Sequence, residues 1–231
     1  MSRSRFLHTI ALSLGTAICC TLLVRPAHAQ RFKVTVTNLT SEETFTPIMV
    51  ASHKAGVKLF TLGSPASVEL EQVAEAGDLA PLEASLRSNK AVLQVVDSGA
   101  PLPPGKSVTL MVDARGPFDH ISVVSMLVPT NDGFFAVNGA YGPNFFRRTV
   151  VIYSPAYDAG TEADDELCAH IPGPPNVCTG EGFNPSRDGD GNFVHVHSGI
   201  HGIGDLSAAT YDWRNPVARI EMTRVPEDGL Y

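Results

Sequence analysis

The chain has 231 residues, of which 18% are charged, and its formal net charge at pH 7 is −7. This acidic balance lacks the basic footprint by which proteins bind nucleic acid or anionic lipid, so neither is expected as the main partner. A chain of this length buries a sizeable core, and one domain is reasonable for an all-β protein of this size.

The first 29 residues have the three parts of a secretory signal peptide. Arg3 and Arg5 give a positive start without acids, residues 6–24 are almost uninterruptedly apolar, and a small-residue Ala-His-Ala pattern ends at residue 29. The alternative is a retained membrane anchor, since the apolar run approaches the roughly 20 residues that span a bilayer. Pro26 and the cleavage pattern favour removal.

Cleavage there would leave residues 30–231 as one domain in the periplasm or outside the cell. Its net charge would be −10, because the lost segment contains three arginines and no acid. No later segment is apolar for long enough to span a bilayer, so we expect no transmembrane segment after removal of the signal.

The first part of the mature chain predicts two strands and two helices. Residues 32–37 alternate apolar and polar side chains, as a half-buried strand does, and residues 46–51 are expected to be its partner. Residues 68–74 have helical spacing between a capping Ser67 and a terminating Gly77, and a second helical stretch is expected shortly after them, at residues 79–86.

The remainder predicts short strands separated by Gly, Pro and Asn-Asp-Gly turns. These strands are expected at residues 92–96, 107–112, 121–128, 134–137 and 219–225. The pattern indicates a mostly β protein, an antiparallel β-sandwich with a short helical insertion. Residues 154–210 are rich in Asp, Gly, Pro and His instead, and a long irregular stretch in a compact domain is more often functional than idle.

Two cysteines remain in the mature chain, Cys168 and Cys178, on either side of a loop rich in Pro and Gly. In an oxidising compartment they are expected to form a disulfide, because two cysteines with this spacing do not make a zinc site. Closing so short a loop contributes about 3 kcal/mol in the chain-entropy treatment of disulfides.

A carboxylate-rich group is the first candidate site. Asp132 lies in a turn between two predicted strands, Asp158 and Glu162 lie in the segment YDAGTEADDE, and residues 164–166 add three more acids. Calcium takes six to eight oxygen ligands, which loops at a sandwich edge can supply. The alternative is a solvated acidic loop, which composition alone favours.

A histidine-rich group is the second candidate site. His195 and His197 would face the same side of a strand, and His201 follows after a glycine, so three imidazoles could bind zinc or copper, with Asp205 near them. The alternative is a structural role for the histidines. There is no G-x-S-x-G nucleophile motif and no free mature cysteine, so we assign no catalytic residue and expect a protein without enzymatic activity.

Five blocks of the sequence together resemble the spondin amino-terminal domain family, whose members occur in animal matrix proteins and as stand-alone secreted bacterial proteins. The blocks follow the family's order: FKVTVT (32–37), SH with VKLF and QVAEAG (52–77), SMLVPTNDGF (125–134), YDAGTE (157–162) and PVARI (216–220). They are spread over nearly all of the mature chain.

The resemblance implies a β-sandwich with a calcium ion at one edge, held by Asp132, Asp158 and Glu162. Glu162 stands where the animal proteins have a second Asp, which keeps the carboxylate on a longer arm. The resemblance therefore favours calcium over a solvated loop. It does not by itself carry adhesion, since a fold does not fix a function. The acid group on a sandwich without a catalytic constellation instead leads us to expect a binding module, for adhesion or for an extracellular or envelope protein or glycan. The resemblance says nothing of the three histidines, so a zinc- or copper-binding protein, even an enzyme, stays the alternative.

Overall fold

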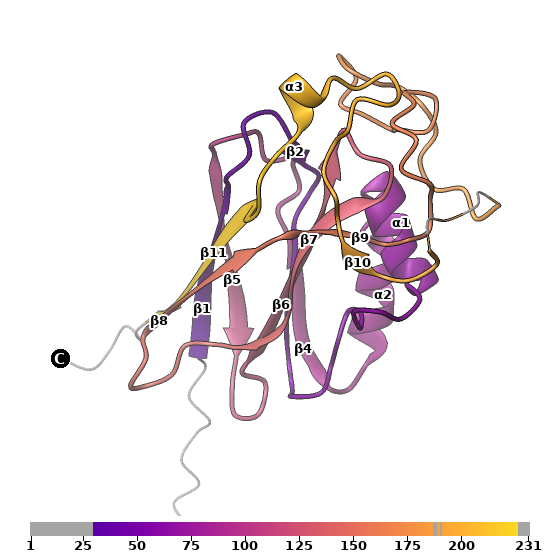
Figure 1. Cartoon of the computed structure of the whole chain (residues 1–231). Helices are drawn as coiled ribbons and strands as arrows, with labels where there is room; N and C mark the ends of the chain where they lie inside the picture. Colours follow the sequence, from indigo (N-terminus) through magenta and orange to yellow (C-terminus); the bar gives the residue numbers. More distant parts are fainter. Residues whose placement is uncertain (1–29, 187–188, 190, 226–231) are drawn as a thin grey trace, which may run out of the picture.

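The computed structural model describes residues 30–186, 189 and 191–225 (Figure 1). The predicted signal segment, residues 1–29, lies outside them. No helix in the described part of the chain is long and apolar enough to cross a membrane.

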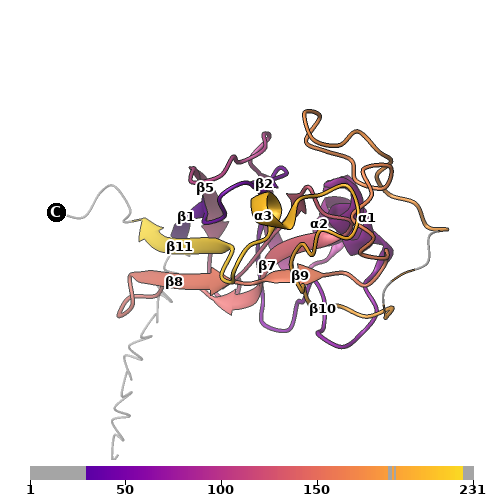
Figure 2. The ribbon, with the colours of Figure 1, turned by 45° about the horizontal axis from the view of Figure 1, so that its top comes forward.

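Two antiparallel sheets make up the domain, as the sequence predicts for a β-sandwich (Figures 1 and 2). The smaller sheet has the order β5-β1-β11-β8. Its strands are β5 (Ser107–Ala114), β1 (Gln30–Asn38), β11 (Ala218–Val225) and β8 (Thr149–Ser154).

The larger sheet has the order β10-β9-β7-β6-β3-β4, and β2 pairs with β6 beside this path. Its strands are β10 (His195–Val196), β9 (Ala156–Asp158), β7 (Gly133–Tyr141), β6 (His120–Val128), β3 (Met49–His53), β4 (Val92–Asp97) and β2 (Thr44–Phe45). Most of the predicted strands are confirmed, whereas β2, β8 and β9 were not predicted.

The predicted pairing of residues 46–51 with the first strand is wrong. That segment contributes to β3, which pairs with β4 and β6, whereas β1 pairs with β5 and β11. Neighbours in sequence belong to different layers here, because the chain crosses from one sheet to the other after β1. The long-range pairing of β1 with β11 forms the centre of the smaller sheet.

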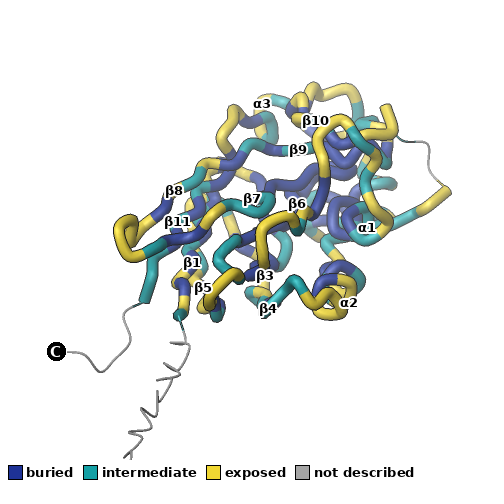
Figure 3. Tube along the Cα trace, turned by 90° about the horizontal axis from the view of Figure 1, so that it is seen from below, coloured by how far each residue is buried: buried dark blue, intermediate teal, exposed yellow. Residues whose placement is uncertain are grey.

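The space between the two sheets holds the larger hydrophobic core. Alternate residues of β1 face it, and Phe32, Val34 and Val36 are fully buried there. A second core lies on the other face of the larger sheet, where Leu70 and Val73 pack with Phe134. Buried segments accordingly run through the middle of the molecule, and exposed turns lie around it (Figure 3).

The helical insertion covers that second face and consists of α1 (Val68–Ala76) and α2 (Ala80–Ser88). Ser67 Oγ accepts from the backbone N–H of Leu70, and Gly77 ends α1 in the left-handed conformation at φ 65°. Both helix signals predicted from the sequence are confirmed. A further short helix, α3 (Ala208–Tyr211), precedes β11.

Candidate metal site at the edge of the larger sheet

The register of the larger sheet brings three distant segments together at one edge. Gly133, the first residue of β7, pairs with Asp158 of β9, and Asp158 in turn pairs with His195 of β10. The acid of the β6–β7 turn, Asp132, therefore lies next to the end of β9. The chain leaves this edge after Asp158 and returns to it at His195, the first residue of β10.

Asp132 is fully buried, and only one of its two carboxylate oxygens is satisfied. Its Oδ2 accepts from the Thr161 N–H at 2.8 Å, the Thr161 hydroxyl at 3.2 Å and the Glu162 N–H at 3.1 Å. No hydrogen-bond donor among the described residues reaches Oδ1. Burial raises the pKa of Asp132, although these N–H donors oppose the shift.

Asp158 repeats this arrangement. Its Oδ1 accepts from the Gly160 N–H at 2.6 Å, while Oδ2 has no hydrogen-bond donor within the described chain. Burial, followed by the charges of Asp132 and Asp164, raises the pKa of Asp158 to about 10. Two neighbouring buried carboxylates repel each other when both are ionised, so a proton or a cation is needed to neutralise at least one of them.

Glu162 and Asp164 extend the acid group on the segment after β9. The buried Glu162 accepts from Asn131 Nδ2 at 3.4 Å, so it lies beside the β6–β7 turn. Asp164 Oδ1 lies 3.7 Å from His197 Nε2, and ligand atoms of Asp158, Asp164 and His197 all lie within 4.8 Å of one another. We call the four acids at this edge the acid site: Asp132, Asp158, Glu162 and Asp164.

His197 is buried against the ring of Trp213, with ring centroids 4.9 Å apart. Its Nδ1 accepts from the Gly199 N–H at 3.0 Å, which leaves the proton of the neutral ring on Nε2. Burial lowers the pKa of His197 to about 4, so the ring is neutral at physiological pH. The Nε2–H group lies on the side of Asp164, but at 3.7 Å it forms no hydrogen bond with that acid or with any other described residue.

The other two predicted histidines have different partners. His195 Nδ1 lies 3.0 Å from the carbonyl oxygen of Phe193, and its Nε2 lies 3.5 Å from Asp158 Oδ2. His201 Nε2 lies 3.0 Å from the Ser198 hydroxyl. Within the described residues, the group of ligand atoms that lie close enough to share an ion includes His197 but neither His195 nor His201.

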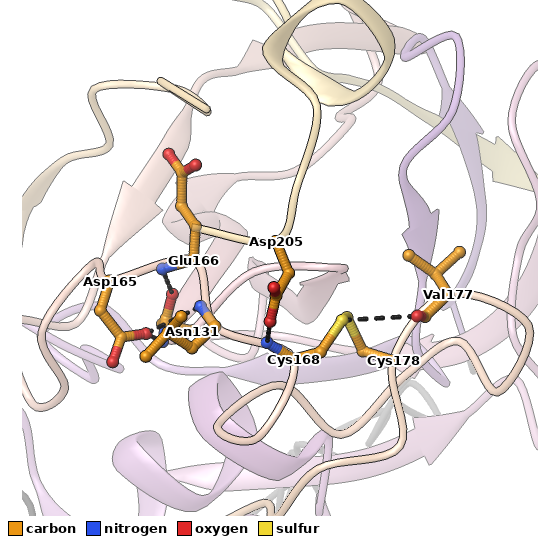
Figure 4. Close-up of a disulfide and its surroundings, with 8 residues drawn as sticks. Asn131, Asp165, Glu166, Cys168, Val177, Cys178 and Asp205 are labelled. Carbon is orange, nitrogen blue, oxygen red and sulfur yellow. Dashed lines mark hydrogen bonds between the residues drawn. A yellow bond between two sulfur atoms is a disulfide. The ribbon is translucent and has the colours of Figure 1, made fainter. Parts of the chain in front are cut away.

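The predicted disulfide between Cys168 and Cys178 is confirmed, with Cα atoms 4.8 Å apart (Figure 4). The bridge begins two residues after Glu166, whose N–H donates to Asn131 Oδ1 at 3.1 Å. Asp205 Oδ2 accepts from the Cys168 N–H at 2.9 Å, so Asp205 supports the disulfide loop (Figure 4).

Sequence reasoning brought Asp132, Asp158 and Glu162 into one group, and the structure buries all three at one edge. It counted Asp164 among the neighbouring acids without naming it as a ligand, and it treated His197 as part of a separate histidine site. It predicted α1 but did not single out Glu75 on that helix, which is fully buried. The helical spacing of α1 could have identified Glu75, because it places this acid on the face that is buried against the core, where a charged side chain needs a partner.

The similarity of this chain to known proteins lies in roughly its first two thirds. A family model described as Spondin_N matches residues 24–166, which include every carboxylate of the acid site but neither the three histidines nor the disulfide. No curated protein matches the chain. Because the match covers more than half of the sequence, the chain belongs to the Spondin_N family.

Proposed function

We propose that this chain is an exported, non-enzymatic binding module whose acid site holds a calcium ion. One observation carries the proposal: Asp132 Oδ1 and Asp158 Oδ2 are buried oxygens that no hydrogen-bond donor reaches among the described residues. Burying a carboxylate without a partner is costly, and a cation placed between several of them removes that cost.

The available ligands are of the kind that calcium prefers. Asp132, Asp158 and Glu162 would supply the carboxylates expected from the family resemblance, and Asp164 would add a fourth. Calcium binds oxygen atoms at flexible geometry, so the longer arm of Glu162 is tolerated. When bound, the ion neutralises these acids and fixes the β6–β7 turn to the segment after β9.

The orientation of His197 supports calcium over zinc or copper at this position. Because Gly199 N–H faces Nδ1, the ring presents Nε2–H to the acids and keeps no lone pair for an ion. Zinc and copper favour imidazole nitrogen, whereas a site of carboxylates alone suits a hard cation. His197 would then position Asp164 by pointing its N–H toward it.

The partner that we propose is a protein or glycan of the cell surface, the envelope or the extracellular matrix. The Spondin_N family and the Cys168–Cys178 disulfide support a place outside the cytoplasm, in the periplasm or in the medium. Such compartments also supply calcium. A sandwich whose edge loops are fixed by an ion presents a pre-ordered surface, which lowers the entropic cost of binding.

Thermal unfolding in calcium and in chelator tests the calcium proposal. Saturation at a hundredfold above Kd stabilises by about 2.7 kcal/mol, and at this chain length each 1 kcal/mol raises Tm by roughly 2–4 °C. Asp158→Asn should abolish most of the calcium-dependent rise. Asp97→Asn is the matched control, because Asp97 is exposed and its turn bond to Gly99 suits an amide equally well. Equal melting of the wild type in calcium and chelator would refute the proposal.

A second candidate is zinc or copper binding through the histidines, with hydrolytic or oxidative chemistry. It is favoured by His195, whose Nδ1 faces a carbonyl and so holds the proton, leaving the Nε2 lone pair 3.5 Å from Asp158 Oδ2. Metal analysis of protein purified without an affinity tag tests it. The variant with His195, His197 and His201 all changed to alanine should lose the metal, and unchanged metal content would reject this candidate.

A further inference from the structure

The turn between β7 and β8 exposes two adjacent aromatic side chains. Phe145 is 70% exposed and Phe146 is 93% exposed, and their rings contact each other at right angles with centroids 5.4 Å apart. Single exposed apolar residues are ordinary on protein surfaces, but two consecutive phenylalanines at a loop tip form a small apolar patch.

This turn is held in one shape by local hydrogen bonds. Asn144 N–H donates to the Arg147 carbonyl at 2.8 Å, and Asn144 Oδ1 accepts from the backbone N–H groups of Phe146 and Arg147 at 2.9 and 2.8 Å. The base of the loop is tight, because a Cβ at Gly142 would lie 2.4 Å from the Phe32 ring. The phenylalanines are therefore presented by an ordered scaffold, which reduces the entropy lost on binding.

Positive charge lies directly behind the two rings. Arg147 and Arg148 are exposed, and the Arg148 carbonyl accepts from the Arg224 N–H at 3.0 Å, which brings a third arginine to the same end. In the part of the chain that is described, none of these three arginines forms an ion pair with a carboxylate.

The acid site lies at the opposite end of β7, which runs from Gly133 to Tyr141. Nine residues of strand separate the two ends by roughly 25 Å. This exceeds the Debye length of about 8 Å at physiological ionic strength, so the acids do not cancel the arginines. The net negative charge of the whole chain therefore does not prevent the exposed Arg147 and Arg148 from giving this tip a local positive charge.

The chain also enters the domain beside this loop. Gln30, the first described residue, donates from Nε2 to the Pro143 carbonyl at 3.4 Å, and in Figure 1 the loop lies near the start of β1 and the end of β11. The apolar residues 6–24 precede Gln30 by only five intervening residues. Those residues span roughly 20 Å at full extension, so during the proposed export this end of the domain faces the bilayer.

We propose that the β7–β8 loop, residues 142–148, is a docking site for the surface of an anionic phospholipid bilayer. Phe145 and Phe146 would enter the interfacial layer, and Arg147 and Arg148 would contact phosphates or acidic headgroups. A bilayer fits better than a protein groove for two reasons. First, the patch is a small exposed tip in which Arg147 and Arg148 directly follow the two phenylalanines. Second, the tip lies at the end of the domain where the chain would meet the membrane during the proposed export.

Vesicle co-sedimentation of the exported, purified protein tests this proposal. Phosphatidylcholine vesicles that contain phosphatidylglycerol should bind the wild type, and pure phosphatidylcholine vesicles should bind it at least about tenfold less. Binding should persist in chelator, which separates it from the calcium proposal. The double variant F145A/F146A and the double variant R147Q/R148Q should each lose at least about tenfold in binding, since each removes one of the two attractions.

Ile203→Ala is the matched control, because Ile203 is also 70% exposed but lies in another loop. It should bind as the wild type does. The proposal is overturned if the wild type ignores anionic vesicles, if F145A/F146A still binds, or if binding requires calcium. It is equally overturned if the phenylalanine variant changes only self-association on a sizing column, which would point to a second copy of the chain as the occupant.

Discussion

The two ends of β7 differ in how their residues are gathered. At the Gly133 end, Asp132 of one turn meets Asp158 and Glu162 of a distant segment, and all three are buried. Asp132 Oδ1 and Asp158 Oδ2 lack hydrogen-bond donors among the described residues. At the other end, four consecutive residues, 145–148, form the exposed tip of one turn. The acid end is therefore coupled to the stability of the whole fold, whereas the loop end can change without affecting it.

The largest effect on this comparison is expected from Gly160→Ala at the acid end. Gly160 has φ +69°, and a Cβ there would lie 2.4 Å from the Phe193 carbonyl oxygen. Backbone strain and a clash with backbone should together cost about 3–4 kcal/mol of unfolding free energy and remove the calcium response. Denaturant unfolding measures the loss.

Gly56→Ala is the control for this substitution. Gly56 has φ +91° but nothing within 4 Å of the added Cβ, so it should cost only about 1 kcal/mol of unfolding free energy. If both variants lost the same stability, close packing around Gly160 would not be what holds the acid site together.

Removal of the disulfide should have the next largest effect. Changing Cys168 and Cys178 to serine should lower the free energy of unfolding by about 3 kcal/mol, because the reduced chain gains loop entropy when it unfolds. Unfolding with and without reductant provides the measurement. The wild type should weaken in reductant and the double variant should not, so a wild type indifferent to reductant would contradict this prediction.

A smaller, pH-dependent effect is expected at Glu43, which shows a second way to neutralise a buried acid. It precedes β2, whose Thr44 pairs with Val128 near the acid site, and neither carboxylate oxygen meets a hydrogen-bond donor in the described chain. Burial, and then the charge of Glu42, raise the pKa of Glu43 well above its ordinary value. We therefore expect Glu43 to be neutralised by a proton and not by an ion.

The folded protein therefore binds this proton more tightly than the unfolded chain does, so stability falls as pH rises from the ordinary carboxyl pKa toward the raised one. At neutral pH, Glu43→Gln should increase the free energy of unfolding by about 1–2 kcal/mol, and below about pH 4 the difference should vanish. Denaturant unfolding across pH measures it. A gain that depended on calcium would instead place Glu43 with the acid site.

Much of the fold could be predicted because its signals are local. The alternation of residues 32–37 identified β1, and Ser67 with Gly77 bounded α1. The strand partners could not be predicted in the same way. The sequence of residues 46–51 is equally compatible with pairing to β1. Which sheet a strand joins depends on which faces pack together in the finished core.

The sequence by itself determined the β-sandwich class, the two cysteines able to bridge and the three carboxylates that the family resemblance brings together. Only the tertiary structure decided that Gly133, Asp158 and His195 share a register, and that Gly199 directs the proton of His197 toward the acids. It also placed the basic loop and the acids at opposite ends of β7. The reason is physical: propensity and capping act between near neighbours, whereas register, burial and charge separation arise when distant segments pack.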